Sequence, residues 1–281
     1  MTADDFGFDT PAVGDAVAAA WERHRARVFE TSRPVSDWLV EHVGAEPGAT
    51  VLELTAGPGE TGFLVAERVG ADGHVLSTDL APGMVAAARR GVEARGLTNV
   101  ECRVMDAQQL DLDDGSVDGV VSRFGVMLMP EPERVAREAR RVLRSGGRFA
   151  YAVWGPPDRN PWLGTLVGSL LQCGHALGGD PFGPGGPFSL GRRDQNEALL
   201  ADAGFADVVV EELEGVMRYD DADDYLDVQG SLAGPVAVLI AALSPDELDA
   251  LRAALVSACE PYRAGAGIEL PWVALAATGV A

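Results

Sequence analysis

Short apolar runs alternate with longer amphipathic stretches from residue 50 onward. The apolar runs have the length of buried strands and are shorter than ordinary helices. They are Thr50–Leu54, Val75–Thr78, Val100–Met105, Val117–Ser122 and Arg148–Trp154. The intervals carry helical spacing of apolar residues, as in Pro82–Arg95 and Glu131–Arg144. Strands separated by helices of this length predict a parallel sheet with crossover connections, and therefore an α/β fold.

The alternation changes after Trp154. Residues 155–188 contain many prolines and glycines around one apolar stretch, Trp162–Leu171, which predicts an inserted helix between loops. Two longer strands are expected later in the chain, over Val208–Met217 and Ile268–Ala276. The first two thirds of the chain therefore differ in organisation from the remainder.

Further helices are predicted outside the sheet. Apolar spacing predicts two helices before the first strand, Val17–Phe29 and Val35–Val43. Capping boxes mark two later helix starts, because the paired side chains satisfy free amides of the first turn. The pairs are Asp194 with Glu197, and Ser244 with Glu247.

These additions predict how the chain is divided. We expect an N-terminal helical lid over residues 1–48 and a core over residues 49–281. The core carries inserted lid segments at about 155–188 and 219–264. Within the second insert, the acidic run Asp220–Asp227 is typical of a solvated face.

The basic residues of this chain are all arginines. There are 22 of them against 43 acidic residues among 281, which gives a net charge of −21. Without lysine there can be no Schiff-base amine and no lysine-bearing phosphate loop. The acidic balance argues against partners such as nucleic acid or an anionic membrane surface. A small-molecule partner is therefore expected.

Membrane, export and metal signals are missing from the sequence. There is no run of about 18 apolar residues, and the acidic start MTADDFGFD is unlike a secretory signal. The three cysteines are scattered, which suits free thiols in a reducing compartment. The four histidines show no metal-ligand spacing. We therefore predict a cytoplasmic protein with no membrane span and no metal.

A glycine-rich loop follows the first predicted strand. Gly57, Gly59 and Gly62 match the spacing that lets backbone approach a nucleotide beside a helix N-terminus. Asp79 follows Gly59 by 20 residues and ends the next strand, where a carboxylate can accept both ribose hydroxyls. This pattern fits an NAD(P)-dependent enzyme as well as an enzyme that uses S-adenosylmethionine.

Three features favour S-adenosylmethionine. Glu53 lies inside the first strand, where an acid needs a partner such as an amino group or a loop amide. The third strand also ends in an acid, Asp106, which could accept the adenine amine. Finally, the two long strands near the end of the chain are a poor match to a second dinucleotide-binding half.

The ordered segments VLELTAGPGETG, STD, MDAQQL and RVLRSGGRFAYAVWG resemble class I S-adenosylmethionine-dependent methyltransferases, closest to the ubiquinone/menaquinone-biosynthesis-like (methyltransferase type 11) group. The resemblance covers residues 48–155 well and the C-terminal strands loosely. It implies a seven-stranded, mostly parallel sheet with an antiparallel last strand, and S-adenosylmethionine as cofactor. The chain departs from the family at Thr55-Ala56 and Pro58 in the loop, and at Glu53, which is usually aspartate.

The resemblance also implies a set of cofactor-binding positions at the carboxyl ends of the first four strands. They are Glu53, Thr55, Ala56, Gly57, Gly59, Thr61, Asp79, Leu80, Met84, Asp106, Ala107, Ser122 and Arg123. The loop would face the methionine moiety, and Asp79 would bind ribose. Leu80 and Met84 would pack on adenine, and Asp106 with Ala107 would hold its edge. Ser122 and Arg123 would line the sulfonium side.

Catalytic residues are harder to identify from the sequence. Methyl transfer is an in-line displacement, so a general base is needed only if the acceptor must lose a proton. His24, His175 and Asp158 are the candidates for that base. Each histidine also fits an ordinary partly exposed residue, and Asp158 also fits a helix cap.

We expect methyl transfer from S-adenosylmethionine to a small, apolar or aromatic acceptor. Trp154, Trp162, Tyr225 and Trp272 would line the acceptor pocket or pack in the core. The alternatives are an NAD(P)-dependent oxidoreductase and a non-catalytic adenosyl-nucleoside-binding protein. An exposed apolar lid face would favour a homodimer.

Overall fold

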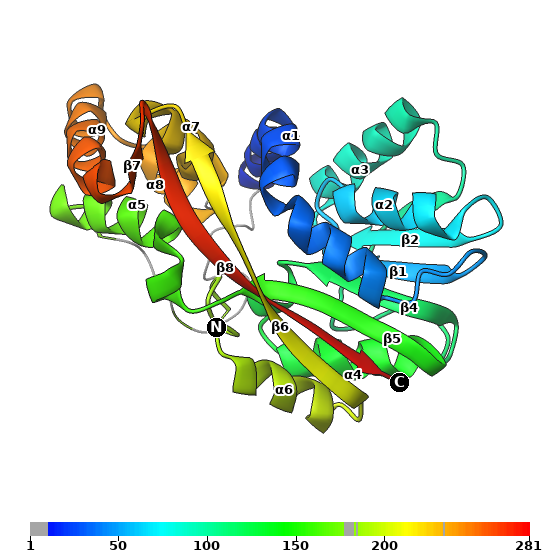
Figure 1. Ribbon diagram of the computed structural model, residues 1–281. Coiled ribbons are helices and arrows are strands. Elements are labelled where there is room, and N and C mark those ends of the chain that lie inside the picture. Colours follow the sequence, from blue (N-terminus) through cyan, green and yellow to red (C-terminus); the bar gives the residue numbers. More distant parts are fainter. Residues whose placement is uncertain (1–10, 177–182, 184, 233) are drawn as a thin grey trace.

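A computed structural model describes residues 11–176, 183, 185–232 and 234–281 (Figure 1). Within this part of the chain, eight strands form one sheet in the order β3-β2-β1-β4-β5-β8-β6, with the two-residue β7 pairing with β8. The strands are β1 Thr50–Leu54, β2 His74–Asp79, β3 Val100–Val104, β4 Val117–Arg123, β5 Leu143–Trp154, β6 Ala206–Tyr219, β7 Arg263–Ala264 and β8 Gly267–Val280.

The sheet direction confirms the predicted fold class. β1 to β5 are joined by parallel pairs, whereas β8 lies antiparallel to both β5 and β6. The eighth strand, β7, is a short addition to the seven that the family resemblance implies. Because β1 to β4 are parallel, their carboxyl ends meet at one edge of the sheet, and the residues after them lie together there.

Helices cover both faces of the sheet. They are α1 Pro11–His42, α2 Glu60–Val69, α3 Pro82–Arg95, α4 Pro132–Val142, α5 Pro161–Gln172, α6 Arg193–Asp202, α7 Ala222–Leu232, α8 Pro235–Ala241 and α9 Pro245–Cys259. Apolar residues of α1 and α2 pack on one face, and those of α4 and α6 on the other. α5, α7, α8 and α9, called the outer helices below, pack together beyond the carboxyl edge (Figure 1).

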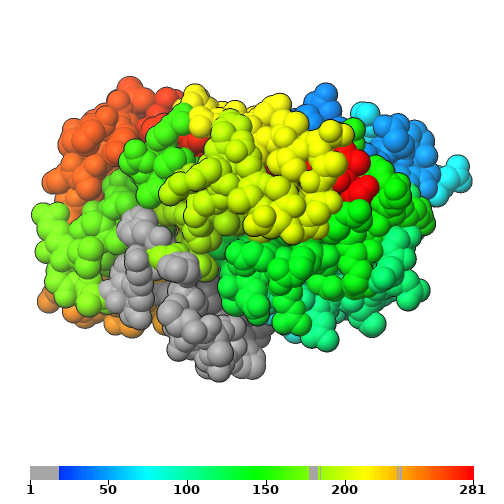
Figure 2. Space-filling model, turned by 90° about the horizontal axis from the view of Figure 1, so that it is seen from below, coloured from blue at the N-terminus to red at the C-terminus, as the bar shows by residue number. Residues whose placement is uncertain are grey.

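The molecule is elongated because the outer helices extend it past the core. Seen from below, α5 and α9 occupy one end, and α4 lies toward the other (Figure 2). The edge strand β6 and helix α6 form much of the surface between them (Figure 2). β8, as long as β6 at 14 residues, runs from the outer helices into the core (Figure 1).

The structure corrects the two helices predicted before the sheet. α1 is one helix of 32 residues that includes Pro34. Ser32 Oγ donates to the Val28 carbonyl at 2.7 Å within the same helix. Val35 and Leu39, fully buried against the sheet, continue the packing on the other side of the proline. Tertiary packing therefore outweighs the cost of proline inside a helix.

The predicted helix caps have mixed outcomes. Ser244 and Glu247 form the expected capping box at the start of α9. The box predicted from Asp194 and Glu197 is wrong, because the Arg192 amide instead donates to Gln195 Oε1 at 3.1 Å. The helix begins at Arg193, two residues earlier than a helix capped by Asp194 would.

Candidate functional site

The glycine loop turns sharply between β1 and α2. Thr55, Gly57 and Gly59 all have positive φ, at 52°, 55° and 87°. A Cβ on Gly59 would lie 2.8 Å from Phe63 Cζ, whereas one on Gly57 would meet open space. The Ala56 amide donates to the Thr78 carbonyl at 2.9 Å and ties the loop to β2. The loop is therefore held from behind, and its Gly57 side is open.

Glu53 fixes this loop from below. Its carboxylate accepts the Gly62 amide at 2.7 Å and the Ser77 hydroxyl at 2.7 Å. Burial raises the pKa of this carboxyl to about 7. A Cβ on Gly62 would lie 2.1 Å from Glu53 Oε2, so the carboxylate explains why that position is glycine. A loop amide is thus one of the two partners that the sequence predicted, and direct contact of Glu53 with a cofactor stays a prediction.

Asp79 ends β2 beside the open side of the loop. Its two carboxylate oxygens accept the Gly57 and Ala81 amides, each at 2.9 Å. Burial raises the pKa of this carboxyl above its ordinary value. Each oxygen can accept a second hydrogen bond. The next residue, Leu80, is 60% exposed, which leaves an apolar surface next to the carboxylate.

A second acid ends the neighbouring strand. Asp106, half-buried just after β3, accepts the Gln108 amide at 2.8 Å through Oδ1. Ala107 is buried beside it, and Met84 is half-buried in the first turn of α3. The two acids therefore flank an apolar surface at the ends of adjacent parallel strands.

The end of β4 differs from the other strand ends because it carries a cation. The Ser122 hydroxyl lies 2.8 Å from Thr55 Oγ1 and links β4 to the glycine loop. The Arg123 guanidinium donates to Ser32 Oγ of α1, and burial lowers its pKa. Phe124, which follows, has φ 60° and stacks on Trp154 with ring centroids 3.9 Å apart. Positive φ at a bulky residue is strained and is typical of functional sites.

Helix α1 contacts the loop through side chains that the sequence did not single out. Arg25 binds Glu60 and also donates to the Pro58 carbonyl at 3.2 Å. Ser36 Oγ lies 3.0 Å from Thr61 Oγ1 in a buried contact. Thr61 therefore faces α1, and its predicted contact with the cofactor stays a prediction. Only the abundance of arginine in Arg23–Arg27 could have signalled an ionic contact of this kind.

Comparison with known proteins identifies the family of this chain. A family model described as a methyltransferase domain matches residues 51–147. Nocamycin O-methyltransferase of Saccharothrix syringae is 31% identical over 285 residues, which cover 95% of this chain and 96% of that protein. The chain belongs to the class I S-adenosylmethionine-dependent methyltransferases. This membership favours methyl transfer over the oxidoreductase and non-catalytic alternatives.

Other similarities of this methyltransferase are more local or limited to the fold. Arsenite methyltransferase of Halobacterium salinarum is 45% identical over 106 residues, which cover 38% of this chain but only 27% of that protein. The solved structure of geranyl diphosphate C-methyltransferase from Streptomyces coelicolor A3(2) is 16% identical, with a TM-score of 0.52. The match covers 91% of this chain and 82% of the other, and it shows a shared fold.

S-adenosylmethionine is the cofactor of this methyltransferase, and the residues at the strand ends fit it. Asp79 and Asp106 retain free acceptor sites for ribose hydroxyls and an adenine amine, and Leu80 offers an apolar surface between them. The open side of Gly57 leaves room for backbone to approach a ligand. The chemistry and order of these groups match an adenosine that lies across β2 and β3.

The three candidate bases lie on three different elements. His24 of α1 is buried, accepts from Arg23 Nε at 3.1 Å, and lies 3.6 Å from Asp227 of α7. Burial lowers the pKa of this histidine. His175 follows α5. Within the described part of the chain no contact joins the three side chains, and a catalytic role for each stays a prediction.

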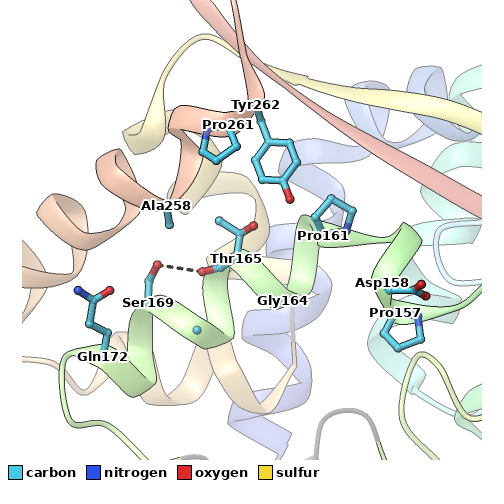
Figure 3. A pocket seen from close by; sticks show the side chains of 11 residues that line it. Pro157, Asp158, Pro161, Gly164, Thr165, Ser169, Gln172, Ala258, Pro261 and Tyr262 are labelled. Atoms are coloured by element: carbon cyan, nitrogen blue, oxygen red, sulfur yellow. Dashed lines mark hydrogen bonds between the residues drawn. The ribbon is translucent and has the colours of Figure 1, made fainter.

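Asp158 lies in a groove between α5 and α9 (Figure 3). This cavity has a volume of about 400 Å³ and is lined on one side by the α5 residues Thr165 and Ser169. Tyr262 lies across from them, and Asp158 lies at one end of the groove (Figure 3). None of the loop residues lines this cavity. Asp158 is therefore exposed beside the outer helices and away from the glycine loop.

Most of the predicted aromatic residues pack in one cluster. Trp162 and Trp272 have ring centroids 5.2 Å and 6.1 Å from that of Trp154. Tyr225 is fully buried and donates to the Trp162 carbonyl at 2.5 Å, so it packs in the core of the outer helices. Trp154 is half-buried, and its ring stacks on Phe124, which directly follows β4.

The acidic run Asp220–Asp227 is more than a solvated face, which corrects the sequence interpretation. Asp224 binds Arg27 of α1 at 2.6 Å, and Asp227 lies 3.1 Å from Arg23. These pairs connect α7 to α1. Pairs of this kind join residues about 200 positions apart, so no local pattern could have shown them. No described helix has the length and apolar character needed to cross a membrane.

Proposed function

We propose that this methyltransferase acts on a small acceptor with an apolar, ring-containing body. The observation that carries this proposal is the stacked pair of Phe124 and Trp154 at the carboxyl ends of β4 and β5. Aromatic faces and edges favour other planar rings. The positive φ of Phe124 is a strained conformation that the surrounding structure must hold in place. Strain of this kind is typical of functional sites and therefore supports a role for Phe124 in shaping this one.

The order of the strand ends supports this placement. The adenosine groups lie on β2 and β3, on one side of β1, and Phe124 follows β4, on the other side. When bound, S-adenosylmethionine supplies a methyl group on a positively charged sulfur. Residues at the end of β4 would hold an acceptor in line with that group, and correct alignment supplies much of the rate in such a displacement.

The lid assignment belongs to this proposal. α1 covers the glycine loop and binds α7 through two arginine–aspartate pairs. Together with the outer helices it would exclude water from the acceptor, which strengthens electrostatic interactions inside the site. Among the relatives, the one matched over nearly its whole length is named an O-methyltransferase. We therefore favour oxygen as the atom that receives the methyl group.

A test compares ring-containing acceptors with aliphatic acceptors of similar size. The enzyme is incubated with methyl-labelled S-adenosylmethionine and either substituted phenols or branched alcohols, and labelled product is counted. We expect transfer to the phenols. The variant Trp154→Leu should raise KM for phenols about tenfold, as expected for the loss of one aromatic contact of about 1.4 kcal/mol.

Leu128→Ala serves as a control, because this side chain is exposed after β4 and is 45% accessible. It should leave KM for phenols unchanged. Equal or better transfer to the aliphatic acceptors would contradict the proposed acceptor class.

A further inference from the structure

We propose that Arg123, together with Ser32, forms a subsite that holds the acceptor oxygen as an oxyanion, so that methyl transfer proceeds without a general base. This inference rests on the proposed function and specifies its acceptor as an acidic hydroxyl. Arg123 then serves as a binding residue for the reacting atom. The argument begins with the surroundings of its guanidinium.

Arg123 differs from the other enclosed arginines of the described chain in its partner. The others with limited side-chain exposure each bind a carboxylate: Arg25 (16% exposed) with Glu60, Arg141 (30%) with Glu138, and Arg27 (36%) with Asp224. Among the described contacts of Arg123, the only hydrogen bond is to the uncharged Ser32 hydroxyl. A buried cation without a bound anion is costly. Its environment is therefore suited to an anionic ligand.

Two buried carboxylates act on Arg123 electrostatically, and both are bound by other groups. Glu53 of β1 accepts the Gly62 amide and the Ser77 hydroxyl. Glu60 of α2 is held by two arginines, one from α1 and one from α3. Neither carboxylate is within ion-pair distance of Arg123 in the described structure. The guanidinium keeps donors that can bind a further oxygen.

The position of Arg123 matches the acceptor side of the site. Ser122 is in register with Leu54, the last residue of β1, so Arg123 lies level with the start of the glycine loop. The adenosine acids lie on the opposite side of β1. Arg123 also immediately precedes Phe124, whose ring stacks on Trp154. A planar ring against that pair would lie at the same strand end as the guanidinium.

Two of the three candidate bases are engaged by other groups or lie in another cavity. His24 is engaged with Arg23 and Asp227, and Asp158 faces the outer groove (Figure 3). A neighbouring positive charge favours the ionised form of an acidic hydroxyl and lowers its pKa by about 1–3 units. An acceptor that binds already ionised needs no base.

The transfer balances in atoms and charge. An electron pair of the acceptor oxyanion forms the oxygen–methyl bond, the sulfur–methyl bond breaks, and its electron pair stays on sulfur. The negative charge on oxygen and the positive charge on sulfur disappear together. No proton, oxidant or reductant is required.

The probe for this subsite is 4-nitrophenol, because only its ionised form is yellow. It is titrated into the complex of enzyme and S-adenosylhomocysteine between pH 5 and pH 8, and the absorbance of the bound phenolate gives its pKa without any turnover. In the wild type we expect this pKa to lie about 1 unit or more below that of free 4-nitrophenol, and full ionisation already at pH 5 marks the larger shifts. Arg123→Gln should abolish the shift, and Arg123→Lys should retain part of it.

Arg137→Gln is the matched control, since Arg137 is exposed on α4. It should leave the spectrum unchanged. Thermal unfolding shows whether each variant is folded. If Arg123→Gln is not folded, the wild type is compared with Arg123→Lys instead. An identical phenolate pKa in wild type and in folded Arg123→Gln, or in Arg123→Lys where only that variant folds, overturns the inference, and the proposed class of ring-containing acceptors is then unaffected. Failure of the wild type to bind 4-nitrophenol overturns the inference and counts against the proposed acceptor class as well.

The carboxylate in the amino-acid part of the cofactor is the other anion that Arg123 could bind. Calorimetry therefore compares S-adenosylhomocysteine with 5′-methylthioadenosine, which lacks the amino-acid part. We expect Arg123→Gln to change both dissociation constants less than threefold. A loss of tenfold or more for S-adenosylhomocysteine alone would assign Arg123 to the cofactor and overturn the inference.

Discussion

Glu53 shows how one buried ionisable side chain can hold a glycine-rich loop in place. Its two oxygens bind the Gly62 amide at the start of α2 and the Ser77 hydroxyl of β2. The sequence predicted that an acid inside a strand must have a partner, and a loop amide was one of the partners expected. It could not predict Ser77, because that contact depends on the alignment of β1 with β2.

The buried state of Glu53 makes stability depend on pH. Its pKa rises from 4.5 to about 7 in the folded chain, so between these values the unfolded chain has lost a proton that the folded chain keeps. The free energy of unfolding contributed by this group therefore falls from about pH 4.5 to about pH 7 and is constant above that range. Glu53→Gln removes this dependence. Relative to the wild type, the variant should gain up to ~3 kcal/mol over that range.

Urea denaturation at intervals from pH 4.5 to pH 8 measures this difference. Glu67→Gln, an exposed position on α2, is the control and should follow the wild type at every pH. A constant difference between Glu53→Gln and the wild type across the range would show that Glu53 titrates alike in the folded and unfolded chains.

At the scale of elements, the sequence predicted helix bounds correctly where the start and stop signals lie within the helix and its flanking residues. α3 has the predicted bounds, Pro82–Arg95, because proline opens it and Gly96 ends it in a left-handed conformation. The break predicted near Pro34 was wrong because packing of α1 against the sheet is not visible locally. The positions of Asp79 and Asp106 at strand ends followed from the local pattern, and their adenosine-binding roles stay predictions. The contacts of α1 with the loop, by contrast, join distant residues.

The contact of α1 with the glycine loop gives a prediction for that helix. Arg25 is 16% exposed and binds Glu60, which is 4% exposed. Arg25→Ala leaves Glu60 with only one arginine partner and should lower the free energy of unfolding by about 3 kcal/mol. It should also weaken S-adenosylhomocysteine binding, since Arg25 holds the Pro58 carbonyl within the loop.

Arg33→Ala is the control on the same helix, because Arg33 and Asp37 form an exposed pair, 50% and 54% accessible. Its effect should stay within about 0.5 kcal/mol. Denaturant unfolding and calorimetry measure both variants. Equal effects of the two substitutions would mean that Arg25 does not hold α1 on the loop.

At the scale of the whole molecule, β8 joins the core to the outer helices. Residues 274–280 pair with β5 in the core, and the strand pairs with β6 along nearly its whole length. Its first half also contacts α5. The sequence placed the last strand at Ile268–Ala276 but could not show that it extends to Val280, since Ala277–Val280 has little apolar bulk. One continuous strand therefore belongs to both parts.

This shared strand predicts cooperative unfolding. Separating the outer helices from the core would break the hydrogen bonds of β8 to one side or the other, so neither part should unfold alone. We expect one calorimetric transition whose van't Hoff and calorimetric enthalpies agree, with the same midpoint by far-ultraviolet circular dichroism. Two resolved transitions would show that the outer helices form an independent unit.

The aromatic cluster has a practical consequence for finding the acceptor. Of the five tryptophans, Trp154, Trp162 and Trp272 belong to this cluster, and Trp154 has its ring against Phe124. Indole emission responds to changes in neighbouring rings and in access of water. The enzyme thus carries an intrinsic optical reporter at the place where an acceptor is proposed to bind. Colourless compounds can therefore be screened by tryptophan fluorescence before any methylated product is known.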